Sequence, residues 1–208
     1  MDPIFTEITK EGMSSAVEAA KEFLSKLAGP AAEEIGLLLR DQGKLYSFKN
    51  RLRVLAKAEA MLAKAGLTPN AVPFRTLVPI LEHASSEDDE SLSTKWAALL
   101  ANSAAKAEST ASHPSFPQIL AEIAPGEARF LDFLLSSGGE VDWNSFRVGL
   151  AEKFQVNRDD IDRYYGNLFR LGLVRIVSRQ GLIKDIIQVC SFGKAFLSAC
   201  SPPGSEDT

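Results

Sequence analysis

The stretch from Asn157 to Cys200 constrains the fold more than any other part of this 208-residue chain. It opens with Asn157, a residue type that caps helices, and aspartates follow where the positive end of a helix favours them. Gly172 predicts the end of this helix. The apolar and aromatic residues between these two points recur at helical spacing, and they are Ile161, Tyr164, Tyr165, Leu168 and Leu171.

Two short strands and a last helix are predicted after Gly172. Residues 174–177 form a β-branched run, residues 178–181 contain a turn signal, and residues 183–190 form a second strand. Ser191 then opens a short helix. Helix, strand, turn, strand and helix are the back half of a winged helix.

The segment before Asn157 supplies the front half of the same fold. A first helix begins at Pro125 and ends at Gly138 and Gly139, Val141 adds a brief strand, and a second helix covers residues 142–154. We therefore predict a winged-helix domain over residues 125–200. Residues 201–208 are rich in Pro, Gly and acidic residues and predict a disordered tail.

Residues 14–124 are predicted to form a helical bundle, after a flexible N-terminus at residues 1–13. Capping and stop signals place its helices at residues 15–29, 30–65, 74–83, 87–107 and 116–123. Leucine and phenylalanine recur at heptad-like spacing in the second of these, which offers a surface for self-association as a homo-oligomer. The predicted fold class is therefore mainly α, with an N-terminal helical bundle of long helices and a C-terminal winged helix with a small β wing.

A local excess of basic residues lies between Arg40 and Lys64, with seven basic side chains against two acidic ones. Such a helix suits phosphate or an acidic partner, although a solvated helix face gives the same pattern. An acidic segment at residues 82–90 offers a third explanation, because domains often neutralise their own charge. That explanation weakens the case for nucleic-acid binding.

Composition favours a soluble, cytoplasmic protein with no integral membrane segment. The net charge of −4 supplies no positive field to attract nucleic acid or anionic lipid. The apolar runs are far shorter than the roughly 20 residues that span a bilayer, and the start of the chain lacks a signal-peptide pattern. Cys190 and Cys200 lack CxxC spacing and are interpreted as buried thiols in a reducing compartment.

Catalysis, metal binding and cofactor binding find no support in the residue pattern. His83 and His113 are the only histidines, and Ser115 beside His113 is explained as a helix cap. The acids at residues 87–90 lack the spacing of a calcium loop, and no nucleotide-binding glycine motif is present. We therefore expect no enzymatic activity, no metal and no cofactor.

The helix after Asn157 occupies the place of the helix that commonly enters the DNA major groove in winged-helix proteins. Aspartates 159, 160 and 162 cancel its arginines, so it is poorly suited to phosphate. Its tyrosines suit a protein interface as well as base stacking. Protein contact is preferred, and a DNA-binding transcriptional regulator is the alternative. The candidate contact residues for either partner are Arg158, Arg163, Tyr164, Arg170, Arg179 and Lys184.

Several short motifs follow one another in a specific order. They are GPAAEEIG at residues 29–36, FKN at 48–50, LVPIL at 77–81, the acidic pair at 88–89, WAALLAN at 96–102, HPSF at 113–116 and PGEA at 125–128. This order resembles the Abi-alpha family, bacterial proteins named for abortive phage infection. HPSF before the segment at residue 125 is its most specific part, and the resemblance spans roughly residues 29–200.

The resemblance implies a non-enzymatic role in antiviral defence and supplies no catalytic residues. It leaves the protein partner unidentified. Trp96 is interpreted as a buried anchor of helix packing. The family-motif residues to which we assign a structural role are Trp96, Asn102, His113, Pro114, Ser115 and Phe116.

Overall fold

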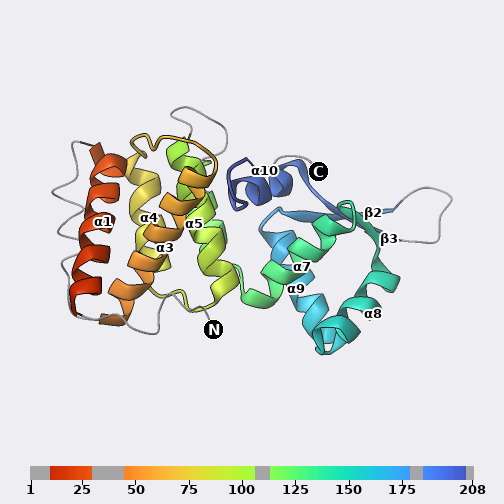
Figure 1. Ribbon diagram of the computed structural model, residues 1–208. Coiled ribbons are helices and arrows are strands. Elements are labelled where there is room, and N and C mark those ends of the chain that lie inside the picture. Colours follow the sequence, from red (N-terminus) through yellow and green to blue (C-terminus); the bar gives the residue numbers. More distant parts are fainter. Residues whose placement is uncertain (1–9, 30–44, 106–112, 179–184, 205–208) are drawn as a thin grey trace. The chain divides into compact units, whose positions relative to one another are not determined.

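The computed structural model describes residues 10–29, 45–105, 113–178 and 185–204. In this part of the chain the fold is mainly helical, with one three-stranded antiparallel sheet. The chain divides into two compact units (Figure 1). The first unit holds residues 1–117 and 199–208, and the second holds residues 118–198.

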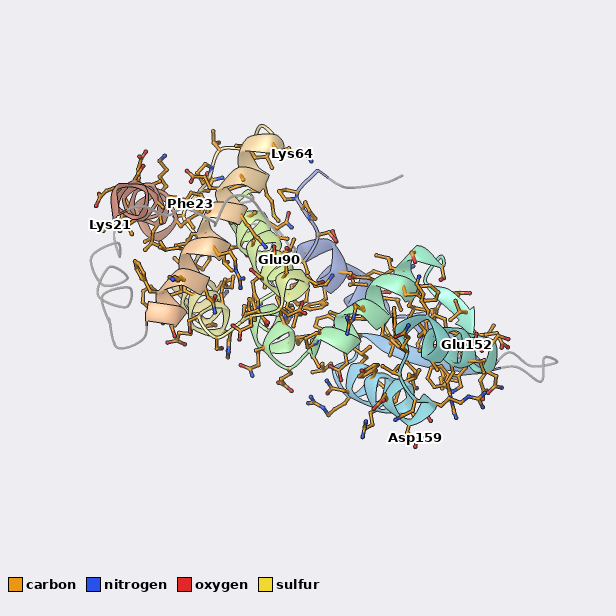
Figure 2. The ribbon with its side chains drawn as sticks, turned by 60° about the horizontal axis from the view of Figure 1, so that its bottom comes forward. Lys21, Phe23, Lys64, Glu90, Glu152 and Asp159 are labelled. Atoms are coloured by element: carbon orange, nitrogen blue, oxygen red, sulfur yellow. The ribbon has the colours of Figure 1, made fainter. Side chains whose placement is uncertain are left out.

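The first unit packs four helices side by side (Figure 1): α1 (Lys10–Ala28), α3 (Leu45–Lys64), α4 (Phe74–Ala84) and α5 (Glu90–Ala105). Helix α5 is the most buried of them, because its alanines let α3 and α4 approach closely. Helix α1 contributes the buried side chains of Phe23, Leu24 and Leu27. Figure 2 shows Phe23 on the side of α1 that faces α3.

The helix bounds correct one of the expectations for this unit and leave another partly untested. Helix α1 begins at Lys10, so residues 10–13, expected to be loose, are helical. A capping-box spacing marks one place where a helix can start, yet good helix formers extend it further. The helix predicted at residues 30–65 is described as α3 from Leu45 onward. Its earlier residues, among them Gly36, Leu38 and Gly43, lie outside the described residues.

The second unit contains α7 (Pro125–Ser136), β1 (Glu140–Asp142), α8 (Trp143–Phe154), α9 (Arg158–Arg170), β2 (Val174–Ser178), β3 (Asp185–Val189) and α10 (Ser191–Ala199). The short helix α6 (Phe116–Ala121) lies where the two units divide along the chain. The predicted order of these elements is confirmed, and their bounds agree with the predicted ones to within a few residues.

The sheet has the strand order β1-β3-β2, with both pairs antiparallel. Val174 pairs with Val189 and Ile176 pairs with Ile187, and three of these four side chains are buried. The opposite face carries a polar row, in which Gln188 of the central strand bonds to side chains of both neighbours. Arg175 of β2 donates to Gln188 at 2.7 Å, and Gln188 donates to Glu140 of β1.

Four helices end in the same hydrogen-bonded turn, in which the backbone passes through the left-handed region and one amide reaches back five residues. These amide-to-carbonyl bonds are Leu67 to Leu62, Gly139 to Leu134, Val156 to Ala151 and Leu173 to Leu168. Glycine occupies the left-handed position after α3, α7 and α9, whereas Gln155 occupies it after α8, with φ of 54°. The predicted stops at Gly66 and Gly172 are thereby confirmed.

Candidate interaction surface

Local chemistry fixes both ends of α9, the helix that carries most of the predicted contact residues. Asn157 Oδ1 accepts the Asp160 amide at 2.8 Å, and Asp160 Oδ2 accepts the Asn157 amide at 3.3 Å. This reciprocal capping box satisfies amides that the first helical turn leaves unpaired. The turn at Gly172 fixes the other end of the helix. With both ends fixed, α9 presents each side chain in a defined direction.

The three arginines of α9 differ in how far the chain itself engages them. Arg163 forms an ion pair with Asp160 on the same helix. Arg170 donates to Glu122 at 2.7 Å, and this hydrogen bond holds the pKa of Glu122 below its usual value. Arg158 is exposed, and no residue of the described ranges forms an ion pair with it. One of the three therefore has its charge fully available.

Tyr164 is half-buried against α7, within its own unit. A Cβ atom at Gly126 of α7 would overlap the Tyr164 hydroxyl and lie 2.5 Å from the ring carbon that bears it. The tyrosine therefore occupies the space that the glycine leaves and packs on α7, and its contact role stays a prediction. Arg179 and Lys184, the other two predicted contact residues, lie outside the described residues.

An aromatic cluster forms where the start of α8 lies against α9. The ring centroids of Trp143 and Tyr165 are 5.0 Å apart, and those of Tyr165 and Phe169 are 5.8 Å apart. Trp143 and Tyr165 are half-buried, whereas Phe169 is 56% exposed, the most of any large hydrophobic side chain in the described part of the chain. Exposed aromatic rings beside half-buried ones are a feature of protein interfaces.

Charged residues continue this surface along the two helices. Arg147 of α8 forms an ion pair with Asp162 of α9 at 3.2 Å, one turn along from the aromatic contact on each helix. At 3.6 residues per turn, the α9 members of the surface fall within an arc of about 60°. We name this surface the α8–α9 stripe, and its residues are Trp143, Arg147, Arg158, Asp162, Tyr165 and Phe169.

Tyr165 is the titratable group of the stripe whose environment is most altered. Burial, and to a smaller extent the nearby Cys190 thiol, raises the pKa of Tyr165 above its usual value near 10. The hydroxyl therefore stays protonated in the folded protein and can donate a hydrogen bond.

From the sequence, Tyr165 was expected at helical spacing in α9 and as a tyrosine suited to a protein interface, whereas Trp143 and Phe169 were not singled out. A signal was present, because Tyr165 and Phe169 are four residues apart and share a helix face. Trp143 joins them from a separate helix, so only the packing of α8 on α9 reveals the cluster. The sequence did identify Arg158, the member of the stripe without an ion pair.

Two of the basic residues of α3, Arg53 and Lys57, bind the acidic segment of their own unit. Arg53 Nη2 donates to the Glu87 carbonyl at 2.7 Å, and Lys57 Nζ lies 2.5 Å from Glu90 Oε1. The buried amide of Asn50 donates to the same segment at Asp88 and at the Ser85 carbonyl. Glu90 is labelled in Figure 2. The explanation by internal neutralisation is thus confirmed for Arg53 and Lys57, whose cationic groups form ion pairs with Glu90.

Two of the family-motif residues lie in the core of the first unit. Trp96 is 1% exposed and stacks on His83 with ring centroids 5.9 Å apart, which confirms its interpretation as a packing anchor. The amide nitrogen of buried Asn102 donates to the carbonyls of Ala199 at 2.9 Å and Ser201 at 2.7 Å. Asn102 therefore holds the point where the chain returns to the first unit, and Ser201, assigned to the tail, is part of this contact.

The HPSF motif forms a local turn in front of α6. His113 Nδ1 lies 2.6 Å from Ser115 Oγ, and the Ser115 amide donates to the same nitrogen at 3.3 Å. The histidine ring accepts the Ser115 amide in this turn, and the expected helix-cap role of Ser115 stays a prediction. Pro114 is exposed at the turn, and Phe116 is buried behind it with its ring 5.5 Å from the histidine ring. His113 is exposed and Ser115 is half-buried.

Metal ligands and membrane spans were also sought in the described ranges. No group of three or more His, Cys, Asp or Glu side chains converges there as a metal site would require. None of the described helices is both long enough and apolar enough to cross a membrane.

A family model described as "Abortive infection alpha" matches residues 49–200, most of the chain. The chain belongs to the abortive infection alpha family. The expected resemblance is thereby confirmed, and the matched range includes the Trp96, Asn102 and HPSF motifs as well as the whole α8–α9 stripe. No curated protein and no solved structure matches the chain. Helix α1 precedes the residues matched to the abortive infection alpha family.

Proposed function

We propose that this member of the abortive infection alpha family acts in bacterial phage defence through protein–protein contacts made by the α8–α9 stripe, without catalysing a reaction. The observation that supports this most is Phe169, a phenylalanine left 56% exposed beside Tyr165 and Trp143. Fully burying such a side chain is worth on the order of 1.5–3 kcal/mol, and a partner that covers the exposed part of Phe169 recovers about half of this.

The charge of the second unit supports a protein partner over DNA. Residues 118–198 carry ten basic and ten acidic side chains, so the unit as a whole has no formal net charge. DNA affinity scales with the number of phosphates that free cations neutralise. Arg163 and Arg170 form ion pairs within the unit, which leaves Arg158 as the free cation of α9 among the described residues.

We propose further that the second unit is a winged helix whose third helix, α9, serves as a protein-binding element. The order α7, β1, α8, α9, β2, β3 and the antiparallel sheet β1-β3-β2 support this assignment. The two free thiols, Cys190 and Cys200, suit a reducing compartment, and we place the protein in the cytoplasm.

The proposed function predicts how phage will plate on bacteria that express the protein. We expect wild type to lower the efficiency of plating and the Phe169→Ser variant to lose this protection while folding normally, since the side chain is mostly exposed. Phe74→Ser is the matched control, because Phe74 is 46% exposed and lies on α4. Protection retained by Phe169→Ser would contradict the proposed contact surface.

A salt-dependent mobility-shift assay tests the DNA-binding alternative. We expect no measurable affinity for duplex DNA at low salt. Binding that falls steeply with salt, and that weakens in Arg158→Ala, would instead favour a transcriptional regulator.

A further inference from the structure

We propose that the partner of the α8–α9 stripe is the same stripe of a second copy of this chain, with the two α9 helices packed antiparallel about a two-fold axis. This inference rests on the proposed function only in taking the stripe as a contact surface. A two-fold interface places one surface against itself, so the surface must be complementary to itself. Three features of the stripe meet that condition.

The first feature is the balance of charge. Arg147 and Asp162 cancel within the stripe, and the exposed Asp159 lies next to Arg158. In the part of the chain that the structure describes, neither Arg158 nor Asp159 has an ion-pair partner. Figure 2 labels Asp159 near the outer end of α9. The stripe has no net charge that would attract a strongly acidic or basic partner. A second copy brings both positive and negative side chains, and each can face an opposite charge.

The second feature is the symmetric order of the side chains along α9. Arg158 and Phe169 are equally far from the middle of the interval between them, and so are Asp162 and Tyr165. An antiparallel arrangement therefore places Arg158 of one copy over Phe169 of the other, where a cation–π contact is favourable. It also places the Tyr165 hydroxyl, kept protonated by burial, opposite the Asp162 carboxylate of the other copy.

The third feature is the room beside the stripe for a second helix. Gly166 lies next to it on α9 near the middle of the interval, is exposed, and has no atom within 4 Å of the place where a Cβ would stand. Small residues let two helix backbones approach closely, toward the 8–10 Å interaxial distance of packed helices. Interfaces of roughly 1,600 Å² have dissociation constants from micromolar downward. A surface of two helix segments on each side should be smaller, so we expect a dissociation constant of about 1 μM or weaker.

Sedimentation of the full chain over a range of concentrations tests this proposal. We expect a monomer–dimer equilibrium for wild type and at least a tenfold weaker association for Gly166→Gln, whose longer side chain would stand between the helices. Gly149→Gln is the matched control: Gly149 is an exposed glycine of α8 with nothing within 4 Å, lies away from the stripe, and should leave the equilibrium unchanged. Both substitutions add a better helix former in open space, so both variants should fold.

Two outcomes would overturn the proposal. One is a wild-type chain that stays monomeric at concentrations well above the expected dissociation constant. The other is a dimer that Gly166→Gln and Phe169→Ser leave as strong as in wild type, which would place the contact elsewhere. If either occurs while phage protection still depends on Phe169, the proposed function stands with a different protein as the partner. Phage protection that does not depend on Phe169 would contradict the proposed function itself.

Discussion

At Gly193 of α10 the packing leaves no room for a side chain. A Cβ at this position would overlap the Leu173 carbonyl oxygen and lie 2.9 Å from both the Leu173 carbonyl carbon and Val189 Cγ1. The Leu173 carbonyl cannot move freely, because it accepts the Cys190 amide at 2.9 Å. The close approach of α10 to the sheet therefore requires glycine.

We predict that Gly193→Ala lowers the free energy of unfolding by about 2–3 kcal/mol, as overpacking against fixed backbone does. Urea denaturation measures the change. Gly149→Ala in α8 is the control: it meets nothing within 4 Å and should raise stability by about 0.5–1 kcal/mol. Equal effects of the two substitutions would show that the contact with Leu173 does not determine the cost.

Tyr165 links the stripe to pH, because burial raises its pKa above the value near 10 that it has in the unfolded chain. As the pH rises past about 10, the unfolded chain releases this proton while the folded protein still holds it. Folding stability therefore falls with rising pH until the folded group also titrates.

We expect unfolding measured between about pH 9 and pH 11 to show a steeper loss of stability for wild type than for Tyr165→Phe. A late-titrating tyrosine in the ultraviolet spectrum of the wild type, absent from the variant, would locate the effect at this hydroxyl. Parallel stability curves for the two proteins would contradict the assignment.

At the scale of the elements, helix α8 ends less favourably than the other helices that share its type of turn. Gln155 stands in the left-handed region with φ of 54°, a conformation that costs a non-glycine residue roughly 1 kcal/mol. The turn is nonetheless formed, since the Val156 amide reaches the Ala151 carbonyl at 3.1 Å. The next helix, α9, begins two residues later and fixes the position of this connection.

We predict that Gln155→Gly raises the free energy of unfolding by about 0.5–1 kcal/mol, although glycine also adds freedom to the unfolded chain. Gln155→Ala keeps the unfavourable conformation and should bring no gain. Chemical denaturation of the two variants and of wild type measures these differences in the free energy of unfolding. A gain in the alanine variant equal to that in the glycine variant would mean that backbone conformation is not the cause.

Elements with local signals could be predicted from the sequence, and contacts between elements could not. Helix ends can be predicted from the residue type alone at Asn157, which caps a helix, and at Gly66 and Gly172, which adopt the left-handed conformation. The helices and strands of residues 125–200 therefore lie close to their predicted bounds. The start of α1 at Lys10 was missed because ordinary helix formers carry no boundary signal. The hydrogen bond from the Ser115 amide to the His113 ring was missed because it depends on ring orientation.

At the scale of the whole molecule, the sequence indicated which segments carry an excess of charge, and the packing of the helices determines which partners those charges have. The basic excess of α3 suggested an outside anion, and only the contacts of Arg53 and Lys57 show that the unit's own acidic segment binds there. The stripe was partly predicted in the same way. Arg158 was identified from the sequence, but Trp143 and Phe169 come together through the packing of α8 on α9.

The proposed function therefore depends on what covers Phe169 in the cell. Site-specific photocrosslinking answers this directly, with a photoreactive phenylalanine analogue placed at position 169, or at position 74 as control, in phage-infected bacteria. We predict a discrete protein adduct from position 169 and none from position 74, with the mass of two chains if the partner is a second copy. A nuclease-sensitive adduct, or no adduct from position 169, would contradict a role through protein contact at the α8–α9 stripe.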